Sequence, residues 1–157
     1  MTATAHALVA GAIATHFAAP EAAIPIALTS HFIMDSIPHW DFGTSWRNRS
    51  KTQTGMFAIA ETLFGISLAV FFYHTTVALP LLLLTIVASL LPDWLEAPWY
   101  IFFAKTNTHG VSKKSGLLEK ISYGFYKIPN IFHSRASLLL GVLTQVVTVW
   151  FFLAVLG

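Results

Sequence analysis

Long apolar stretches, separated by a few polar breaks, constrain this sequence more than any other feature. Of the 157 residues, 55% are hydrophobic and only 10% are charged, whereas soluble domains average about 25% charged residues. Several stretches approach the roughly 20 residues that cross a bilayer core. A disordered or nucleic-acid-coating chain is therefore excluded and a soluble domain is disfavoured. We expect an integral membrane protein that forms one domain over residues 1–157.

Five apolar stretches predict an all-α, polytopic helical bundle. They are Thr2–Ala19, Ala22–Ile37, Met56–Val77, Leu79–Leu91 and Ile131–Leu156. The first, second and fourth are short for a full crossing, so they either cross with polar ends at the interface or pack as partial or re-entrant helices. Between the last two stretches, apolar residues from Leu117 to Phe125 repeat at helical spacing among charged ones. This pattern predicts an interfacial amphipathic helix.

The basic residues indicate the orientation. If the five stretches cross alternately, one side of the membrane holds every Lys and Arg: Arg47, Arg49, Lys51, Lys105, Lys113, Lys114, Lys120, Lys127 and Arg135. That side is cytoplasmic by the positive-inside rule. We therefore expect a cytoplasmic N-terminus, a location in a bacterial inner membrane, and contact with anionic membrane lipids but not with nucleic acid.

Histidine and carboxylate residues dominate the polar positions near the apolar stretches. The sequence has seven histidines and no cysteine, so any metal must be held by His, Asp or Glu. Ionisable groups within or beside membrane spans are costly and are candidates for function. Eight of them map to the cytoplasmic side: His6, His31, Asp35, His39, Asp41, Glu61, Asp93 and His133. Three others, His16, Glu21 and His74, map to the opposite side and suggest no shared role.

The strongest local pattern lies between residues 30 and 41. His31 and Asp35 are four residues apart, so on a helix they share one face, where they can bind one ion or the carboxylate can orient the imidazole. Pro38 should end that helix and let His39 and Asp41 turn back over the same site. A buried hydrogen bond between His and Asp, with an interfacial His39, is the structural alternative.

Three further candidates have structural alternatives of their own. Asp93 follows a proline and precedes Glu96 by three positions, which also fits a helix N-cap with a capping box. His133 is expected in the first turn of the last apolar helix, where the helix dipole favours the neutral, metal-binding imidazole; a snorkelling interfacial residue is the alternative. Glu61 is either a partner of a ligand or a general base, or it pairs with a hydroxyl or histidine of a neighbouring helix.

Four of these motifs resemble those of the membrane-bound, predicted metal-dependent hydrolases related to a LexA-regulated inner-membrane protein. The motifs are the histidine at position six (His6), Ser30-His31 through Asp35 to Pro38, Leu91-Pro92-Asp93, and His133-Ser134. The pattern is also similar to zinc-dependent phospholipase C, in which helices supply His and Asp to a metal cluster. The resemblance implies one or two zinc-like ions, held by His6, His31, Asp35, Asp93 and His133.

The leading hypothesis is a metal-dependent hydrolase that acts at the cytoplasmic interface on a phosphate or carboxylic ester of an amphiphile. His39 and Glu61 are its candidate catalytic residues. Two other classes stay open. A metal or proton transporter would use the same groups as a relay and needs polar groups that continue to the far side. A small structural membrane subunit would hold no metal.

Overall fold

The computed structural model describes residues 1–41, 48–104 and 110–156, and within these ranges it contains no strand. Its helices are α1 (Ala3–His16), α2 (Pro20–Ser36), α3 (Lys51–Tyr73), α4 (Leu79–Pro98) with the π-helical turn η2 (Trp99–Phe103), α5 (Leu117–Phe132) and α6 (Leu138–Leu156). The all-α prediction is confirmed. Arg47 and Lys105, two of the basic residues used for orientation, lie outside the described residues.

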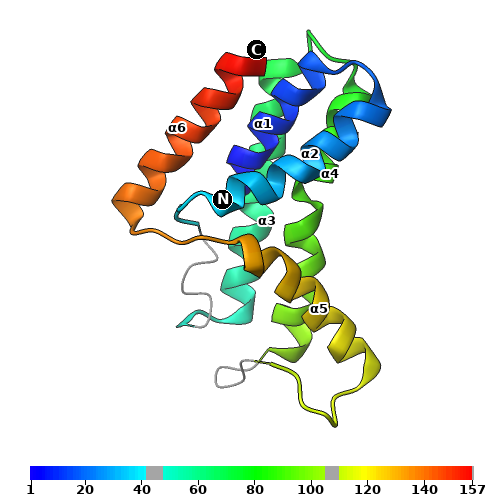
Figure 1. The fold of residues 1–157 in the computed structure, drawn as a ribbon, viewed down its shortest axis with the longest axis vertical. Helices are drawn as coiled ribbons and strands as arrows, with labels where there is room; N and C mark the ends of the chain where they lie inside the picture. The colour runs from blue at the N-terminus through cyan, green and yellow to red at the C-terminus, as the bar shows by residue number, and fades with distance from the viewer. Residues whose placement is uncertain (42–47, 105–109, 157) are drawn as a thin grey trace.

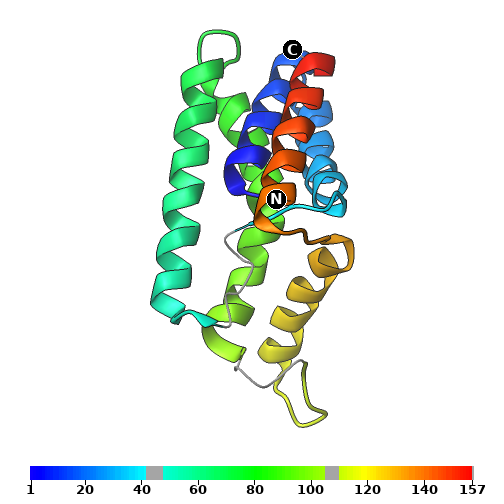
Figure 2. The same cartoon turned by 90° about the vertical axis from the view of Figure 1, so that its left-hand side faces the viewer.

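The helices form two levels along the long axis of the molecule (Figures 1 and 2). The upper level contains α1, α2 and α6, with the C-terminal half of α3 and the N-terminal half of α4. The lower level contains the other halves of α3 and α4, together with η2 and α5. The start of α1, the end of α2, the end of α5 and the start of α6 all lie near the boundary between the levels, so side chains from distant parts of the sequence meet there.

Helix α1 is the centre of the upper level. Ten of its 14 residues are buried, and it contacts α2, α3, α4 and α6. It is rich in Ala and Gly, and small residues let helices approach closely. The backbone of its first turn comes close to Gly65 of α3, where an added Cβ would lie 2.8 Å from the Cα of Thr4. This contact holds the first turn of α1, and with it His6, against α3.

Three helical segments are long and apolar enough to cross a membrane: Lys51–Tyr73, Leu79–Phe103 and Leu138–Leu156. The sequence predicts five crossings, but α1 and α2 have only 14 and 17 residues. At 1.5 Å per residue they extend about 21 and 26 Å, less than the roughly 30 Å of a bilayer core. Large apolar side chains cover the outward faces of α3 and α6, as contact with lipid requires, and Leu139 is 85% exposed.

Helix α4 is longer than the sequence predicts. It passes Leu91 and Pro92 without a break and reaches Pro98, so Asp93 lies inside a helix and is not an N-cap. The predicted capping box with Glu96 is therefore wrong. Pro92 removes one backbone hydrogen bond, but it is buried, and we attribute the continuity of the helix to packing against its neighbours.

The last predicted stretch is divided into two helices. The amphipathic helix predicted from residue 117 is confirmed as α5, but it extends through Pro129 to Phe132, and His133 is its C-cap. His133 is thus not in the first turn of an apolar helix, and the expected effect of the helix dipole is reversed, because a helix C-terminus favours a protonated imidazole.

The segment between α5 and α6 stays non-helical because its backbone groups pair with the end of α2. Ser134 N–H donates to the carbonyl of Asp35 (2.9 Å), His39 N–H donates to the carbonyl of Ser134 (3.1 Å), and Ala136 N–H donates to the carbonyl of His39 (2.8 Å). This short bridge fixes His133 and His39 on either side of Asp35.

Candidate metal centre

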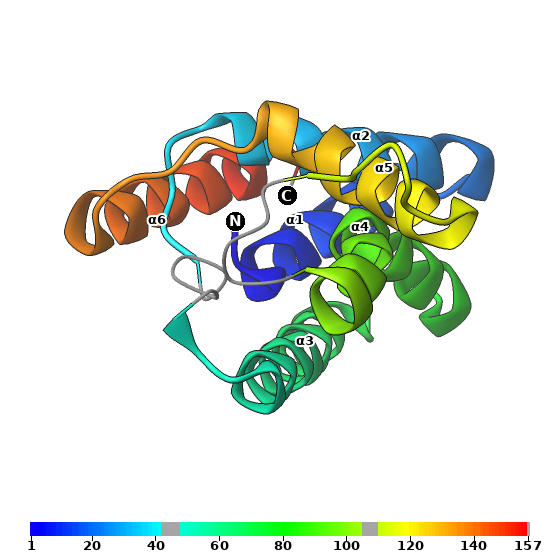
Figure 3. The same ribbon diagram turned by 90° about the horizontal axis from the view of Figure 1, so that it is seen from below.

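The histidines and aspartates selected from the sequence gather at the boundary between the two levels. His6 comes from the start of α1, Asp35 from the last turn of α2 and Asp93 from α4, whereas His39 and His133 follow the ends of α2 and α5. The view from below shows that the N-terminus, the end of α2 and the segment between α5 and α6 lie around one place (Figure 3). The predicted return of the chain after Pro38 is confirmed.

Asp35 is the centre of this cluster. Its carboxylate is 2% exposed, and His6, His31 and His39 have no exposed surface. The amino group of Met1 also contacts its Oδ1. The four imidazoles around it lie at 3.2 Å (His6 Nε2), 3.4 Å (His133 Nδ1), 3.6 Å (His31 Nε2) and 3.8 Å (His39 Nε2). Four imidazoles around one buried carboxylate are more than a single hydrogen bond between His and Asp explains.

The cluster contains two sets of three side chains that could each hold a metal ion. The sets are His6, His31 and Asp93, and Asp35, His39 and His133, and within each set the ligand atoms lie within 4.8 Å of one another. This is close to the roughly 4.5 Å that two donors can span when they share one ion at about 2.0 to 2.2 Å. Both sets offer imidazole nitrogens and carboxylate oxygens, the ligands of zinc sites without cysteine.

The hydrogen bonds of the histidines suit a cation. His39 Nδ1–H donates to the carbonyl of Ile37 at 2.8 Å, so in the neutral ring Nε2 carries a lone pair. That lone pair faces Asp41 Oδ2 at 3.4 Å and Asp35 Oδ1 at 3.8 Å. Nε2 of His39 and of His31 are buried without a hydrogen-bond partner among the described residues. A cation between these atoms would satisfy acceptors that otherwise face one another.

His133 links two carboxylates of the cluster. Its Nε2 lies 3.0 Å from Asp41 Oδ2, and its Nδ1 lies 3.4 Å from Asp35 Oδ2. Burial lowers the pKa of His133, but its hydrogen bonds to Asp35 and Asp41 and their charges outweigh burial and raise this pKa to about 9. Burial acts to raise the pKa of Asp41, yet the neighbouring imidazole groups, that of His133 above all, hold it well below its usual range. Without metal, the charged His133 ring thus balances part of the negative charge.

The structure brings together all five residues that the sequence analysis selects as ligands, namely His6, His31, Asp35, Asp93 and His133. His39, selected for catalysis, completes the second set. Glu61, also selected for catalysis, belongs to neither set. Its Oε1 accepts a hydrogen bond from Thr4 N–H at 3.3 Å, at the N-terminus of α1, where a carboxylate is favoured by the helix dipole. Glu61 therefore anchors the helix that carries His6.

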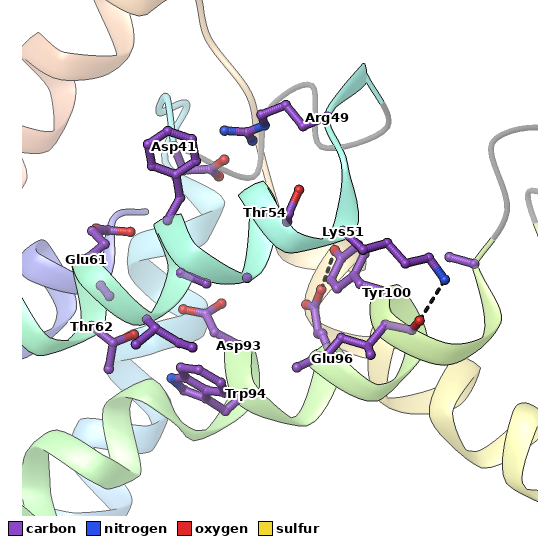
Figure 4. A pocket seen from close by; sticks show the side chains of 18 of the residues that line it. Asp41, Arg49, Lys51, Thr54, Glu61, Thr62, Asp93, Trp94, Glu96 and Tyr100 are labelled. Atoms are coloured by element: carbon purple, nitrogen blue, oxygen red, sulfur yellow. Dashed lines mark hydrogen bonds between the residues drawn. The ribbon is translucent and has the colours of Figure 1, made fainter.

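A cavity of about 320 Å³ lies beside the cluster, between the N-terminal half of α3 and the C-terminal half of α4 (Figure 4). Asp41, Asp93 and His133 of the cluster contribute to its lining, as does Glu61. Apolar side chains line much of the remainder: Phe57, Ala58, Ile59, Trp94, Ala97 and Ile101. Three basic side chains complete the charged lining: Arg49, Lys51 and Arg135. The cluster thus borders a cavity with apolar walls.

Two buried polar residues that support the site are not selected by the sequence analysis. Gln145 of α6 accepts from Thr2 N–H at 2.9 Å and donates to the carbonyl of Trp40 at 2.5 Å, so it joins the start of α1 to the segment that carries His39. Glu96 accepts from the hydroxyl of Tyr100 at 2.7 Å and from Asn130 Nδ2 at 3.3 Å. A polar amide in an otherwise apolar helix is the signal that points to Gln145.

The fold and the cluster define an all-α protein with a buried centre of histidine and aspartate beside a cavity. No known protein family matches this sequence, and no curated protein or solved structure matches it.

Proposed function

We propose that this protein is a membrane-embedded, metal-dependent hydrolase, with two zinc-like ions held by the His6 set and the Asp35 set. The observation that carries the proposal is the arrangement of four imidazoles around the buried Asp35, which provides two sets of ligand atoms. The substrate is a phosphate or carboxylic ester of an amphiphile, because the cluster borders a cavity with apolar walls. The four motifs that resemble those of membrane-bound hydrolases support this class.

Asp35 is the residue that joins the two sets. Oδ1 lies 3.2 Å from His6 of one set, and Oδ2 lies 3.4 Å from His133 of the other, so the sets are side by side. Divalent ions bound there would supply a water of lowered pKa and a Lewis acid for the ester oxygen. His39 is oriented for ligation by its hydrogen bond to Ile37. Glu61 also lines the cavity and is our candidate to accept a proton from an attacking water.

In the bilayer, α3, α4 and α6 span the membrane, and α1 and α2 are short helices of the same bundle. The cavity between α3 and α4 then lies in the half of the membrane nearer to the cytoplasmic surface, which the basic residues define by the positive-inside rule, and the cluster borders this cavity. Helix α5 lies along this surface, because apolar residues such as Leu117, Leu118 and Ile131 are exposed on it beside Lys120 and Lys127. This arrangement retains the cytoplasmic N-terminus and bacterial inner membrane inferred from the sequence.

The transporter hypothesis has less support, because the region above the cluster is apolar. A relay needs polar groups that continue toward the far side. The core of the upper level contains Val9, Ile13, Leu82 and Ile86, each fully buried. Thr85 lies among them, but its hydroxyl donates within its own helix, to the carbonyl of Leu81 at 2.8 Å. Among the described residues, the groups of the cluster that border a cavity are Asp41, Asp93 and His133, and this cavity lies in the lower level.

Elemental analysis of the protein purified in detergent tests the proposal. We expect about two metal ions per chain in the wild type and a clear loss of metal in His31→Ala. The control is His74→Ala, which should lose no metal, because His74 is exposed at the C-terminal end of α3 and does not belong to the cluster. The metal-loaded protein should hydrolyse phosphate or carboxylic esters of long-chain alcohols, and His31→Ala should not. A wild type without bound metal, or equal metal contents in the two variants, would show that the proposal is wrong.

A further inference from the structure

We propose that the cavity between α3 and α4 selects a phosphate ester of a long-chain alcohol, with the phosphate at the His/Asp cluster and the chain between the two helices. This inference depends on the proposed metal-dependent hydrolase function. It chooses between the phosphate and carboxylic esters that the proposed function leaves open. The charges of the lining, the boundaries of the cavity and its size support it independently.

The charges of the lining suit a phosphate only when metal is bound. Three basic side chains, Arg49, Lys51 and Arg135, face four carboxylates: Asp41, Glu61, Asp93 and Glu96. Even with a charged His133 ring, which also lines the cavity, the four positive groups do not outnumber the four carboxylates, so the metal-free lining offers an anion no excess of positive charge. Two divalent cations would add four positive charges and make the lining positive. A neutral carboxylic ester would need neither this added charge nor the three basic residues.

The basic residues lie at the edge of the cavity. Figure 4 shows Arg49 beside Asp41, with its guanidinium turned toward that carboxylate. The Arg49 guanidinium also lies 5.4 Å from the centre of the Phe57 ring, which begins the apolar wall. Arg49 thus stands where a charged head group would meet an apolar chain, and guanidinium groups bind phosphate oxygens in pairs.

The boundaries of the cavity favour a lateral entry from the lipid. Lys51 Nζ, at the start of α3, donates to the carbonyl of Ile101 in η2 at 2.7 Å, so the two helices are joined at the lower end of the cavity. The cluster bounds the cavity above. Alongside it, Met56 and Ile59 of α3 and Trp94 of α4 are exposed, and in a bilayer such side chains face acyl chains. A chain that enters between the helices can lie against the apolar part of the lining, which includes Phe57, Ala58 and Ile59.

The volume of the cavity limits what it can enclose. About 320 Å³ is at the small end of the roughly 300 to 1,000 Å³ range of ligand sites. This space suits a head group and the first part of a single chain, while the remainder of the chain lies in the lipid.

Binding of dodecyl phosphate to the purified, metal-loaded protein in neutral detergent tests this inference. Dodecanol and inorganic phosphate are the comparison ligands, because each has only one half of the proposed substrate. We expect dodecyl phosphate to bind at least about tenfold more tightly than either, since dodecanol lacks the charge-assisted hydrogen bonds of the phosphate and inorganic phosphate lacks the apolar chain. Removal of the metal with a chelator should abolish this preference.

Two alanines of α3 provide a matched pair of variants. Ala58 and Ala60 are both exposed, but only Ala58 lines the cavity. Ala58→Trp should weaken binding of dodecyl phosphate about tenfold or more, and Ala60→Trp should leave it unchanged, with the same metal content in both. Should Ala58→Trp lose its metal and fail to fold, Arg49→Gln is the second variant, and it should weaken binding of dodecyl phosphate but not of dodecanol.

The possible results separate the two proposals. Metal-loaded protein that binds dodecanol or inorganic phosphate as tightly as dodecyl phosphate overturns this inference and leaves the metal-dependent hydrolase standing. The same holds if Ala58→Trp and Ala60→Trp bind dodecyl phosphate equally. A protein that binds neither metal nor dodecyl phosphate overturns both proposals.

Discussion

The two levels of the molecule differ in what lines their cavities. In the upper level, a cavity of about 410 Å³ between α1, α2 and α6 is lined mainly by apolar side chains such as Ile13 and Phe152. In the lower level, the facing parts of α3 and α4 leave a cavity of about 320 Å³, and its lining includes Asp93 and His133 of the His/Asp cluster. The cluster lies at the boundary between the levels. Among the described residues, it therefore borders the lower cavity and contributes no residue to the upper one, which favours a site reached from one side over a path across the membrane.

Asp35→Asn should have the largest effect, because it removes the charge around which both ligand sets are arranged. The amide has the same size, so we expect the protein to insert and fold. Its metal affinity should fall about 100-fold, at the upper end of the 10- to 100-fold range typical of residues around metal sites, and hydrolysis should be lost. Metal titration and activity measurements check this.

Glu21→Gln is the matched control for Asp35→Asn, because Glu21 is an exposed carboxylate in the first turn of the same helix. It should leave metal affinity unchanged. If Asp35 is only a buried carboxylate that binds no metal, Asp35→Asn would instead have the same metal content as the wild type. It would also melt at a higher temperature than the wild type, since an ionised group in an apolar environment is costly. That result would contradict our assignment of the site.

A pair of isoleucines tests the contrast between the two levels directly. Ile86 is fully buried above the cluster, whereas Ile59 is 51% exposed in the lower level. Ile86→Ala should lower the free energy of unfolding by about 2 to 5 kcal/mol, because it leaves a void in a packed core. Ile59→Ala should change it by no more than about 0.5 kcal/mol. Unfolding in mixed micelles measures both, and equal losses would mean that the levels are packed alike.

Gly65→Ala tests the contact that places His6. The added Cβ would lie 2.8 Å from the Cα and 3.0 Å from the N of Thr4, which are backbone atoms, so α1 has to move. We expect a loss of about 1 to 3 kcal/mol in the free energy of unfolding and weaker metal binding.

Gly55→Ala in the same helix is the control for Gly65→Ala, because no atom lies within 4 Å of its added Cβ. It should stabilise α3 by about 0.5 to 1 kcal/mol through helix propensity alone. If Gly65→Ala were equally stabilising, the close approach of α1 to α3 would not exist.

Much of the helical architecture can be predicted from the sequence, because apolar stretches and breaks act locally. The end of α2 before Pro38 and the shared face of His31 and Asp35 follow from helix geometry and from the missing N–H of proline. The same local rule fails at Pro92, where α4 continues because tertiary packing outweighs one lost hydrogen bond. Local patterns therefore predict where a helix can end but not where it must.

The composition of the site is less accessible from the sequence, because it depends on contacts between distant segments. The sequence predicts His133 in the first turn of a helix. In the structure, the backbone N–H of Ser134 donates to the carbonyl of Asp35, and the His133 ring lies beside the Asp35 carboxylate. Gln145 supports the site through partners more than 100 residues away, at Thr2 and Trp40. No spacing in the sequence indicates such pairs.

Thr144→Val should have the smallest effect, and it tests whether the segment after α2 depends on α6 for its position. The Thr144 hydroxyl donates to the carbonyl of Pro38 at 2.5 Å, one residue before His39. Valine has nearly the same shape but cannot donate, so the carbonyl loses a partner at a cost of about 0.5 to 1.5 kcal/mol. Because His39 belongs to the Asp35 set and not to the His6 set, we expect the affinity for the ion of the Asp35 set to fall about threefold. The affinity for the ion of the His6 set should stay unchanged.

Thr75→Val, at an exposed threonine in the turn after α3, is the control and should change neither affinity. Titration that resolves two binding steps measures the difference, and equal weakening of both steps in Thr144→Val would mean that the two sets do not bind their ions separately.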